Sequence, residues 1–274
     1  MAKRGYCFNT STIRNCGLSP IEEIQLAGQI GYDGIELWTA EIFRHLSGGG
    51  SLDDLRAALD SNGVQAVNLI AFFAWAEPDQ LEREAALEEA RVVFEMAAAL
   101  NCQYVAAPPA GVREMSVPAA DLAPRYADLQ KATEDTGVLP LLEFWGGAST
   151  LGSLQDALDV LDALGDPDTR ILADVFHMSK SPGSEALLSR LRGEQIGLFH
   201  VNDYPKADDP MSLNDSDRVY PGDGAAPIAD IVRRLDAIGY AGMWSLELFN
   251  ESYEANGAEH AARVGLEKTR RAFN

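Results

Sequence analysis

The chain has 274 residues, 46% of them apolar, and a formal net charge of −20 from 42 acidic and 22 basic side chains. This negative field repels phosphate backbones and argues against nucleic acid as a partner, and the apolar content suffices for a core without a disulfide or structural metal. No segment approaches the roughly 18 uncharged apolar residues of a membrane span. Because Cys7, Cys16 and Cys102 lack paired spacing and the first residues lack the apolar core of a signal peptide, we expect a cytoplasmic protein without a membrane partner.

Short apolar runs alternate with helical patterns along the whole chain. Strands are expected at residues 5–9, 34–38, 66–72, 104–109, 139–145, 170–176, 196–203 and 243–249. Helices are expected at residues 20–30, 52–61, 79–100, 119–136, 153–164, 184–192, 227–238 and 257–272. Ser19 and Glu22 form a capping-box pattern around Pro20, and the helix after Ser51 begins with a similar signal.

Eight strands, each followed by a helix and without a break in composition, predict an α/β protein with a single-domain (β/α)8 TIM barrel over residues 1–274. The length is close to the roughly 250 residues typical of that fold. A doubly wound open sheet shares the same alternation. It usually carries a glycine-rich fingerprint after the first strand, and "FNTSTIRNCG" is not such a fingerprint.

Ionisable side chains occur near the ends of four consecutive strands. Glu143 lies in "LLEFW", Asp174 in "LADVF", His200 in "LFHVND" and Glu247 in "LELF". Since the carboxyl ends of barrel strands face the active site, these four side chains are expected at one level of one site. Glu143 and Glu247 interrupt otherwise apolar strands, where an unpaired charge is costly.

Such a set of oxygen donors with one imidazole favours one divalent metal ion. It suits Mn²⁺, Mg²⁺ or Co²⁺, and Zn²⁺ also fits. Each residue alone has a structural explanation, for example an internal ion pair or a hydrogen-bonded core histidine, and only the set predicts the metal. His177 follows Asp174 by three residues and is expected to contact a substrate oxygen.

The segments around these residues resemble a known superfamily over nearly the whole chain. "EFW", "DVFH", "FHVND", "PGDG" and "LELF", together with "GYDGIELW" at residues 31–38, are similar to the sugar phosphate isomerase/epimerase superfamily with xylose-isomerase-like TIM barrels. Ketose 3-epimerases, hydroxypyruvate isomerase and inosose isomerases and dehydratases belong to it. The resemblance implies a small sugar or cyclitol substrate and a homo-oligomer.

Carried over by position, the resemblance makes Glu143, Asp174, His200 and Glu247 the metal ligands and His177 a substrate contact. Ketose epimerases place an arginine six residues after the ligand histidine, where this chain has Lys206. Arg218, in "DRVYPGDG", is the alternative positively charged residue. Lys206 and Arg218 are therefore both candidate substrate-binding residues. Endonuclease IV shares the fold, but its site uses further histidines from earlier strands. The ends of the earlier strands of this chain contain no histidine at those places.

These parts support proton removal from a carbon next to a carbonyl, through an enediolate that a divalent ion stabilises. Glu143 and Glu247 are the expected catalytic acid and base. The leading hypothesis is an isomerase or epimerase of a ketose or keto-polyol. The alternative is a lyase or dehydratase of an inosose or 3-keto-glycoside with the same metal site, and a non-catalytic sugar-binding barrel is a third.

Aromatic residues and one long loop complete the predicted site. Trp38, Phe72, Phe73, Trp75 and Trp145 lie at or just past strand ends, where they stack on sugars or pack between loops. The acid-rich segment 204–224 is long for a connection between a strand and a helix. Its length predicts a functional lid, although a solvated or oligomer-contacting loop has the same composition.

Overall fold

The structure, a computed structural model, describes residues 4–273 of the chain. Eight parallel strands form a closed barrel in sequence order, and β1 pairs with both β2 and β8. The strands are β1 (Tyr6–Asn9), β2 (Gly34–Trp38), β3 (Gln65–Ile70), β4 (Tyr104–Ala107), β5 (Leu139–Glu143), β6 (Arg170–Asp174), β7 (Ile196–Val201) and β8 (Trp244–Leu246). The predicted TIM barrel is therefore confirmed.

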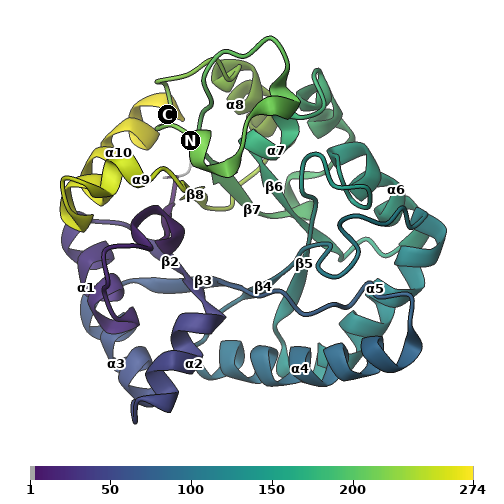
Figure 1. Cartoon of the computed structure of the whole chain (residues 1–274), viewed down its shortest axis with the longest axis horizontal. Helices are drawn as coiled ribbons and strands as arrows, with labels where there is room; N and C mark the ends of the chain where they lie inside the picture. The colour runs from purple at the N-terminus through teal and green to yellow at the C-terminus, as the bar shows by residue number, and fades with distance from the viewer. Residues whose placement is uncertain (1–3, 274) are drawn as a thin grey trace.

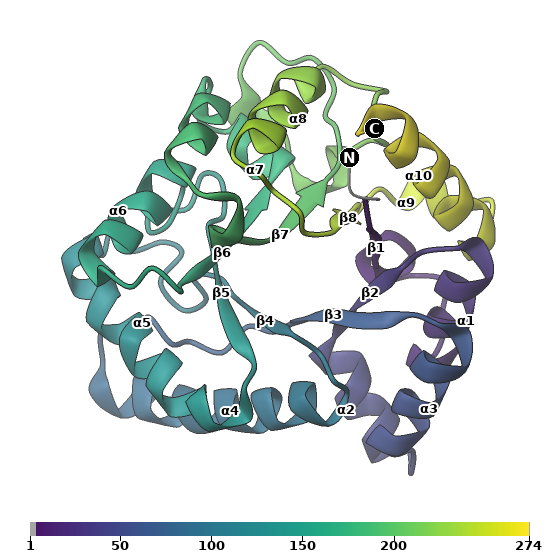
Figure 2. The ribbon, with the colours of Figure 1, turned by 180° about the vertical axis from the view of Figure 1, so that it is seen from behind.

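Helices surround the barrel as an outer ring, as both faces show (Figures 1 and 2). They are α1 (Pro20–Ile30), α2 (Thr39–Ser47), α3 (Leu52–Asn62), α4 (Gln80–Ala99), α5 (Ala119–Thr133), α6 (Leu154–Leu164), α7 (Val175–Ser179), α8 (Ile228–Ala237), α9 (Glu251–Glu254) and α10 (Ala258–Ala272). The predicted capping box is present at α1, where Ser19 accepts from the Glu22 N–H and Glu22 accepts from the Ser19 N–H. No helix among residues 4–273 is long and apolar enough to cross a membrane.

Most predicted elements agree with the structure within a few residues, and one helix differs in type. Residues 184–190 form a 3₁₀ helix after Gly183, which has a left-handed φ of 84°. The chain reaches this segment after α7, which begins directly at the end of β6 and was not predicted. Also unpredicted were α2 and α9.

The barrel interior is divided into an apolar layer and a polar layer. Leu141, Leu172 and Leu198 belong to the apolar cluster inside the barrel. Because side chains two residues apart share one face of a strand, the next inward positions on β5, β6 and β7 are Glu143, Asp174 and His200. The strand period therefore places these polar side chains on an apolar floor at the carboxyl end of the barrel.

Candidate metal centre and active site

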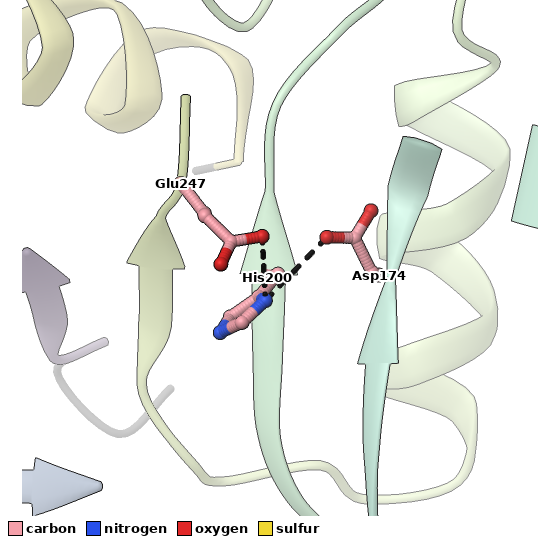
Figure 3. Close-up of side chains that lie close together, drawn as sticks. All are labelled: Asp174, His200 and Glu247. Carbon is pink, nitrogen blue, oxygen red and sulfur yellow. Dashed lines mark ion pairs between the residues drawn. The ribbon is translucent and has the colours of Figure 1, made fainter. Parts of the chain in front are cut away.

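Three of the predicted ligands converge at the carboxyl ends of β6, β7 and β8. Asp174 ends β6, His200 is paired with it in register on β7, and Glu247 directly follows β8. His200 Nδ1 lies 3.0 Å from Glu247 Oε2 and 3.4 Å from Asp174 Oδ2. One donor atom of each residue lies within 4.8 Å of the others, and all three side chains are buried. Figure 3 shows them pointing toward one another.

Asp174 has a second role that explains its spacing from His177. Its Oδ1 accepts the N–H groups of Phe176, at 2.6 Å, and His177, at 3.1 Å, and so caps the first turn of α7. This cap leaves Oδ2 toward the cluster and fixes the position of His177 beside it. Asn202 donates to both Asp174 oxygens, at 3.2 and 3.3 Å, and holds the carboxylate from β7's end.

Arg218 lies between two of the carboxylates of the cluster. Its Nη1 donates to Asp174 Oδ2 at 2.8 Å and to Glu247 Oε2 at 2.6 Å, and the side chain is 1% exposed. Its Nη2 donates to Asp215 at 2.6 Å and faces His177 Nε2 at 3.3 Å. A buried guanidinium thus balances the negative charge of the donor cluster.

Glu143 faces the same cavity but does not join the compact group of three. Its Oε1 accepts a hydrogen bond from Trp145 Nε1 at 3.2 Å. The cavity has a volume of about 390 Å³ and is also lined by Glu247, His177 and Arg218. Glu143 and Glu247 therefore reach one space from β5 and β8, which β6 and β7 separate.

The donor set fits a divalent cation. Nδ1 of His200 is fully buried and makes no aligned hydrogen bond among the described residues, although two carboxylates lie beside it. An imidazole nitrogen with two carboxylate oxygens is a common ligand set for Mn²⁺, Co²⁺ and Zn²⁺. Asp174, His200 and Glu247 can therefore hold the ion, with Glu143 at the edge of the site.

Burial and neighbouring charges set the protonation of these groups. Burial raises the pKa of Glu143 to about 8, and nearby Glu247 adds to the rise. Burial also lowers the pKa of His177 to about 4, with a further contribution from Arg218, so this imidazole is neutral. Asp174 is buried too, which opposes ionisation, but the Arg218 guanidinium holds its pKa well below the usual range. The site thus contains carboxyl groups with different proton affinities.

The aromatic and basic candidates separate into two groups. Trp38, Phe72 and Trp145 line the cavity, with ring centroids 5.5 Å apart for the first pair and 5.9 Å for the second. Phe73 and Trp75 are instead buried in the core between strands and helices. For these two residues the structure therefore favours packing over substrate stacking, the two alternatives that the sequence left open.

Lys206 and Arg218 also differ. Lys206 is exposed and is not among the residues that line the cavity, whereas Arg218 lines it. The segment 204–224 folds beside the cavity and contributes Met211, Leu213 and Asn214 to its wall. Of these two positively charged side chains, the structure brings only Arg218 to the donor cluster.

The sequence analysis missed Glu36, a buried carboxylate in the middle of β2. Its two oxygens lie 3.0 and 3.1 Å from His200 Nε2. The signal was present, since Glu36 interrupts the apolar run "GIELW" as Glu247 interrupts "LELF". Asn9 at the end of β1 was also missed, and its Nδ2 donates to Glu36 at 3.3 Å and to Glu247 at 3.0 Å.

A parallel eight-stranded barrel with an acidic donor cluster at its carboxyl end is typical of metal-assisted chemistry on small substrates. The chain belongs to the xylose isomerase-like TIM barrel family, whose model matches residues 24–272. This membership confirms the predicted superfamily.

Relatives in the family have different activities. The chain is 27% identical over 270 residues to an inosose isomerase of Halalkalibacterium halodurans, covering 96% of this chain and 94% of the relative. It is 25% identical over 265 residues to a 3-dehydroshikimate dehydratase of Pseudomonas aeruginosa, covering 93% of this chain but only 40% of that protein.

Solved structures confirm the fold. The chain resembles a crystal structure of the IolI protein with a bound zinc atom, with a TM-score of 0.90 and 24% identity over 98% of both chains. It also resembles the D-psicose 3-epimerase of Clostridium cellulolyticum H10, with a TM-score of 0.78 and 17% identity over 98% of this chain and 99% of the other. Its relatives are thus isomerases, epimerases and dehydratases.

Proposed function

We propose that the protein is a divalent-metal-dependent isomerase of a cyclitol ketone or related ketose, acting by proton transfer next to the carbonyl. The observation that carries this proposal is the placement of Glu143 and Glu247 on separate strands around one cavity, beside the cluster of Asp174 and His200. A binding protein has no need of two carboxylates that approach one ligand from different strands.

Asp174, His200, Glu247 and Glu143 would hold the ion. When bound, a divalent ion polarises a carbonyl oxygen and lowers the energy of the negative charge that develops on it. The protein's own groups then have separate tasks. Neutral His177, which lines the cavity, would hydrogen-bond a substrate oxygen, and Arg218 would balance the charge of Asp174 and Glu247.

One carboxylate removes the proton from the carbon next to the carbonyl, and the resulting enediol form accepts a proton at another position. Glu143 and Glu247 are the groups for these two steps, because both line the cavity and both are buried. Delivery to the neighbouring carbon moves the carbonyl and gives isomerisation. Delivery to the opposite face of the same carbon gives epimerisation.

The cavity suits a small, ring-shaped substrate. Its volume of about 390 Å³ lies in the usual range for small-molecule sites, roughly 300–1,000 Å³. Trp38, Phe72 and Trp145 provide apolar walls, which suit the C–H faces of a sugar or cyclitol. The similarity to inosose isomerases over almost the full length supports a cyclitol ketone.

A dehydratase is the second candidate. The same first step followed by loss of a hydroxyl group from the next carbon releases water. The relatives named 3-dehydroshikimate dehydratase, which match 93% of this chain, support it. Cytoplasmic localisation, a single domain over the full chain and a homo-oligomer remain predictions.

The metal-loaded protein should be incubated with inososes, ketoses, 3-keto-glucosides and 3-dehydroshikimate, and the products followed by NMR and mass spectrometry. Product of unchanged mass supports the isomerase, and loss of water or of an aglycone supports the lyase. Glu143→Gln and Glu247→Gln should each abolish turnover, while the control Glu23→Gln, a buried glutamate on α1, keeps it. Sugar binding without any turnover by the wild type would contradict both candidates.

A further inference from the structure

Glu36 is a fully buried carboxylate that contacts His200, one of the residues of the donor cluster. It projects into the barrel from β2. Its neighbours Ile35 and Leu37 point the other way, into the hydrophobic core between the strands and the helices. Glu36 is 0% exposed and is not among the residues that line the cavity. A buried charge is costly unless it is paired and hydrogen-bonded, so the position requires an explanation that substrate contact does not provide.

The partners of Glu36 leave few of its lone pairs unused. Oε2 accepts from Asn68 Nδ2 at 2.7 Å, and Oε1 accepts from Ser245 Oγ and from Asn9 Nδ2, the latter at 3.3 Å. Both oxygens also face His200 Nε2, at 3.0 and 3.1 Å. Side chains from β1, β3 and β8 thus hold the carboxylate where it meets the imidazole.

This contact determines how His200 is presented. A carboxylate accepts hydrogen bonds and does not donate them when ionised, so Nε2 must carry the proton that points to Glu36. With Nε2 held there, the ring can present only Nδ1 to Asp174 and Glu247. Histidine ligands commonly donate their second nitrogen to a carboxylate, which fixes the tautomer and the ring orientation.

We propose that Glu36 is a positioning residue that holds His200 with Nδ1 toward the metal, and that Asn68, Asn9 and Ser245 hold Glu36 in turn. The proposal rests on the proposed function, because it assumes that His200 is a ligand. Asn9 extends the arrangement, since its amide also donates to Glu247 Oε1 at 3.0 Å. One network therefore positions the imidazole ligand and one of the two catalytic carboxylates.

The test compares Co²⁺ binding by the wild type, Glu36→Gln, Asn68→Ala and Glu23→Gln. Affinity is measured by competition with a chelating dye, and thermal unfolding of each metal-free protein shows that it is folded. Loss of such a partner typically weakens metal binding by about 10–100-fold, and we expect this loss for Glu36→Gln. Asn68→Ala should give a smaller loss in the same direction, and Glu23→Gln should match the wild type.

A spectroscopic signal distinguishes positioning from a general effect on folding. In the Co²⁺-loaded wild type, the imidazole N–H of His200 should give a shifted proton resonance that exchanges slowly with solvent, because Glu36 accepts it in a buried site. In Glu36→Gln that resonance should exchange faster or be lost. Wild-type affinity and an unchanged resonance in Glu36→Gln would overturn the positioning role alone. Absence of Co²⁺ binding by the wild type would overturn the proposed metal site and this inference together. If Glu36→Gln does not fold, Asn68→Ala decides, and wild-type affinity in that variant would contradict the proposal.

Discussion

Asp203→Asn should loosen the long loop beside the cavity and lower the free energy of unfolding. Asp203 is 1% exposed and accepts four backbone N–H groups: Oδ1 from Tyr204 and Ala226, both at 2.8 Å, and Oδ2 from Gly222 and Gly224, both at 3.0 Å. Asparagine has the same shape but turns an NH₂ group toward two of these donors. Two hydrogen bonds to a charged group are lost, each contributing about 1.5–3 kcal/mol, so the expected loss is about 3–6 kcal/mol.

The assay is urea unfolding of the metal-free protein, with amide hydrogen exchange at Gly222 and Gly224. Asp223→Asn is the matched control, because Asp223 lies in the same loop and pairs with the partly exposed Lys268; such a pair contributes about 0–1 kcal/mol. Asp203 also exchanges two backbone hydrogen bonds with Val219, the neighbour of Arg218, so faster exchange should extend to that residue. A loss equal to that of the control, with unchanged exchange, would refute the reasoning.

Two further predictions concern the buried carboxyl group of Glu23 and the choice between Lys206 and Arg218 as the substrate contact. Burial, with Glu41 and Glu22 nearby, raises the pKa of Glu23 from 4.5 to about 8, which corresponds to at most about 5 kcal/mol. Because the folded state binds this proton more tightly, the contribution of Glu23 to stability falls as pH rises from about 4.5 to 8. Glu143, with a pKa of about 8, contributes a fall over the same range, so Glu23→Gln should reduce the fall in the free energy of urea unfolding between pH 5 and 8.5 without abolishing it. A stability difference between the two proteins that does not change with pH would contradict this prediction. Lys206→Ala should leave the KM of the identified substrate unchanged, whereas Arg218→Met should raise it about tenfold or more. A KM that rises in Lys206→Ala and stays unchanged in Arg218→Met would instead identify Lys206 as the substrate contact.

The strand period made much of the candidate site predictable. Glu143, Asp174, His200 and Glu247 each interrupt or end an apolar strand, and parallel barrel strands end at one level, so their approach follows from the sequence pattern. The same rule applies to Glu36, but its place in the middle of a strand hid its role. Only the register of the closed barrel shows that β2 faces β7 across the interior.

Loop paths were less predictable because distant hydrogen bonds determine them. The family resemblance left Lys206 and Arg218 as alternative substrate contacts, because the path of the loop depends on hydrogen bonds of Asp203 and Lys180 that the sequence does not show. Lys180 Nζ donates to the carbonyl groups of Pro210 and Leu213, and this part of the loop lines the cavity. Sequence also left the role of Trp75 open for a similar reason, because a distant contact decides it: the indole N–H donates to the Pro108 carbonyl at 2.8 Å, away from the site.

The most direct test of the central claim is solvent deuterium incorporation by the metal-loaded protein with an inosose in D₂O, followed by proton NMR. The account predicts that deuterium enters at the carbon next to the carbonyl, and that Glu143→Gln and Glu247→Gln each prevent it. Rapid conversion of the substrate without any deuterium incorporation, or unchanged incorporation by both variants, would contradict proton transfer by these two carboxylates.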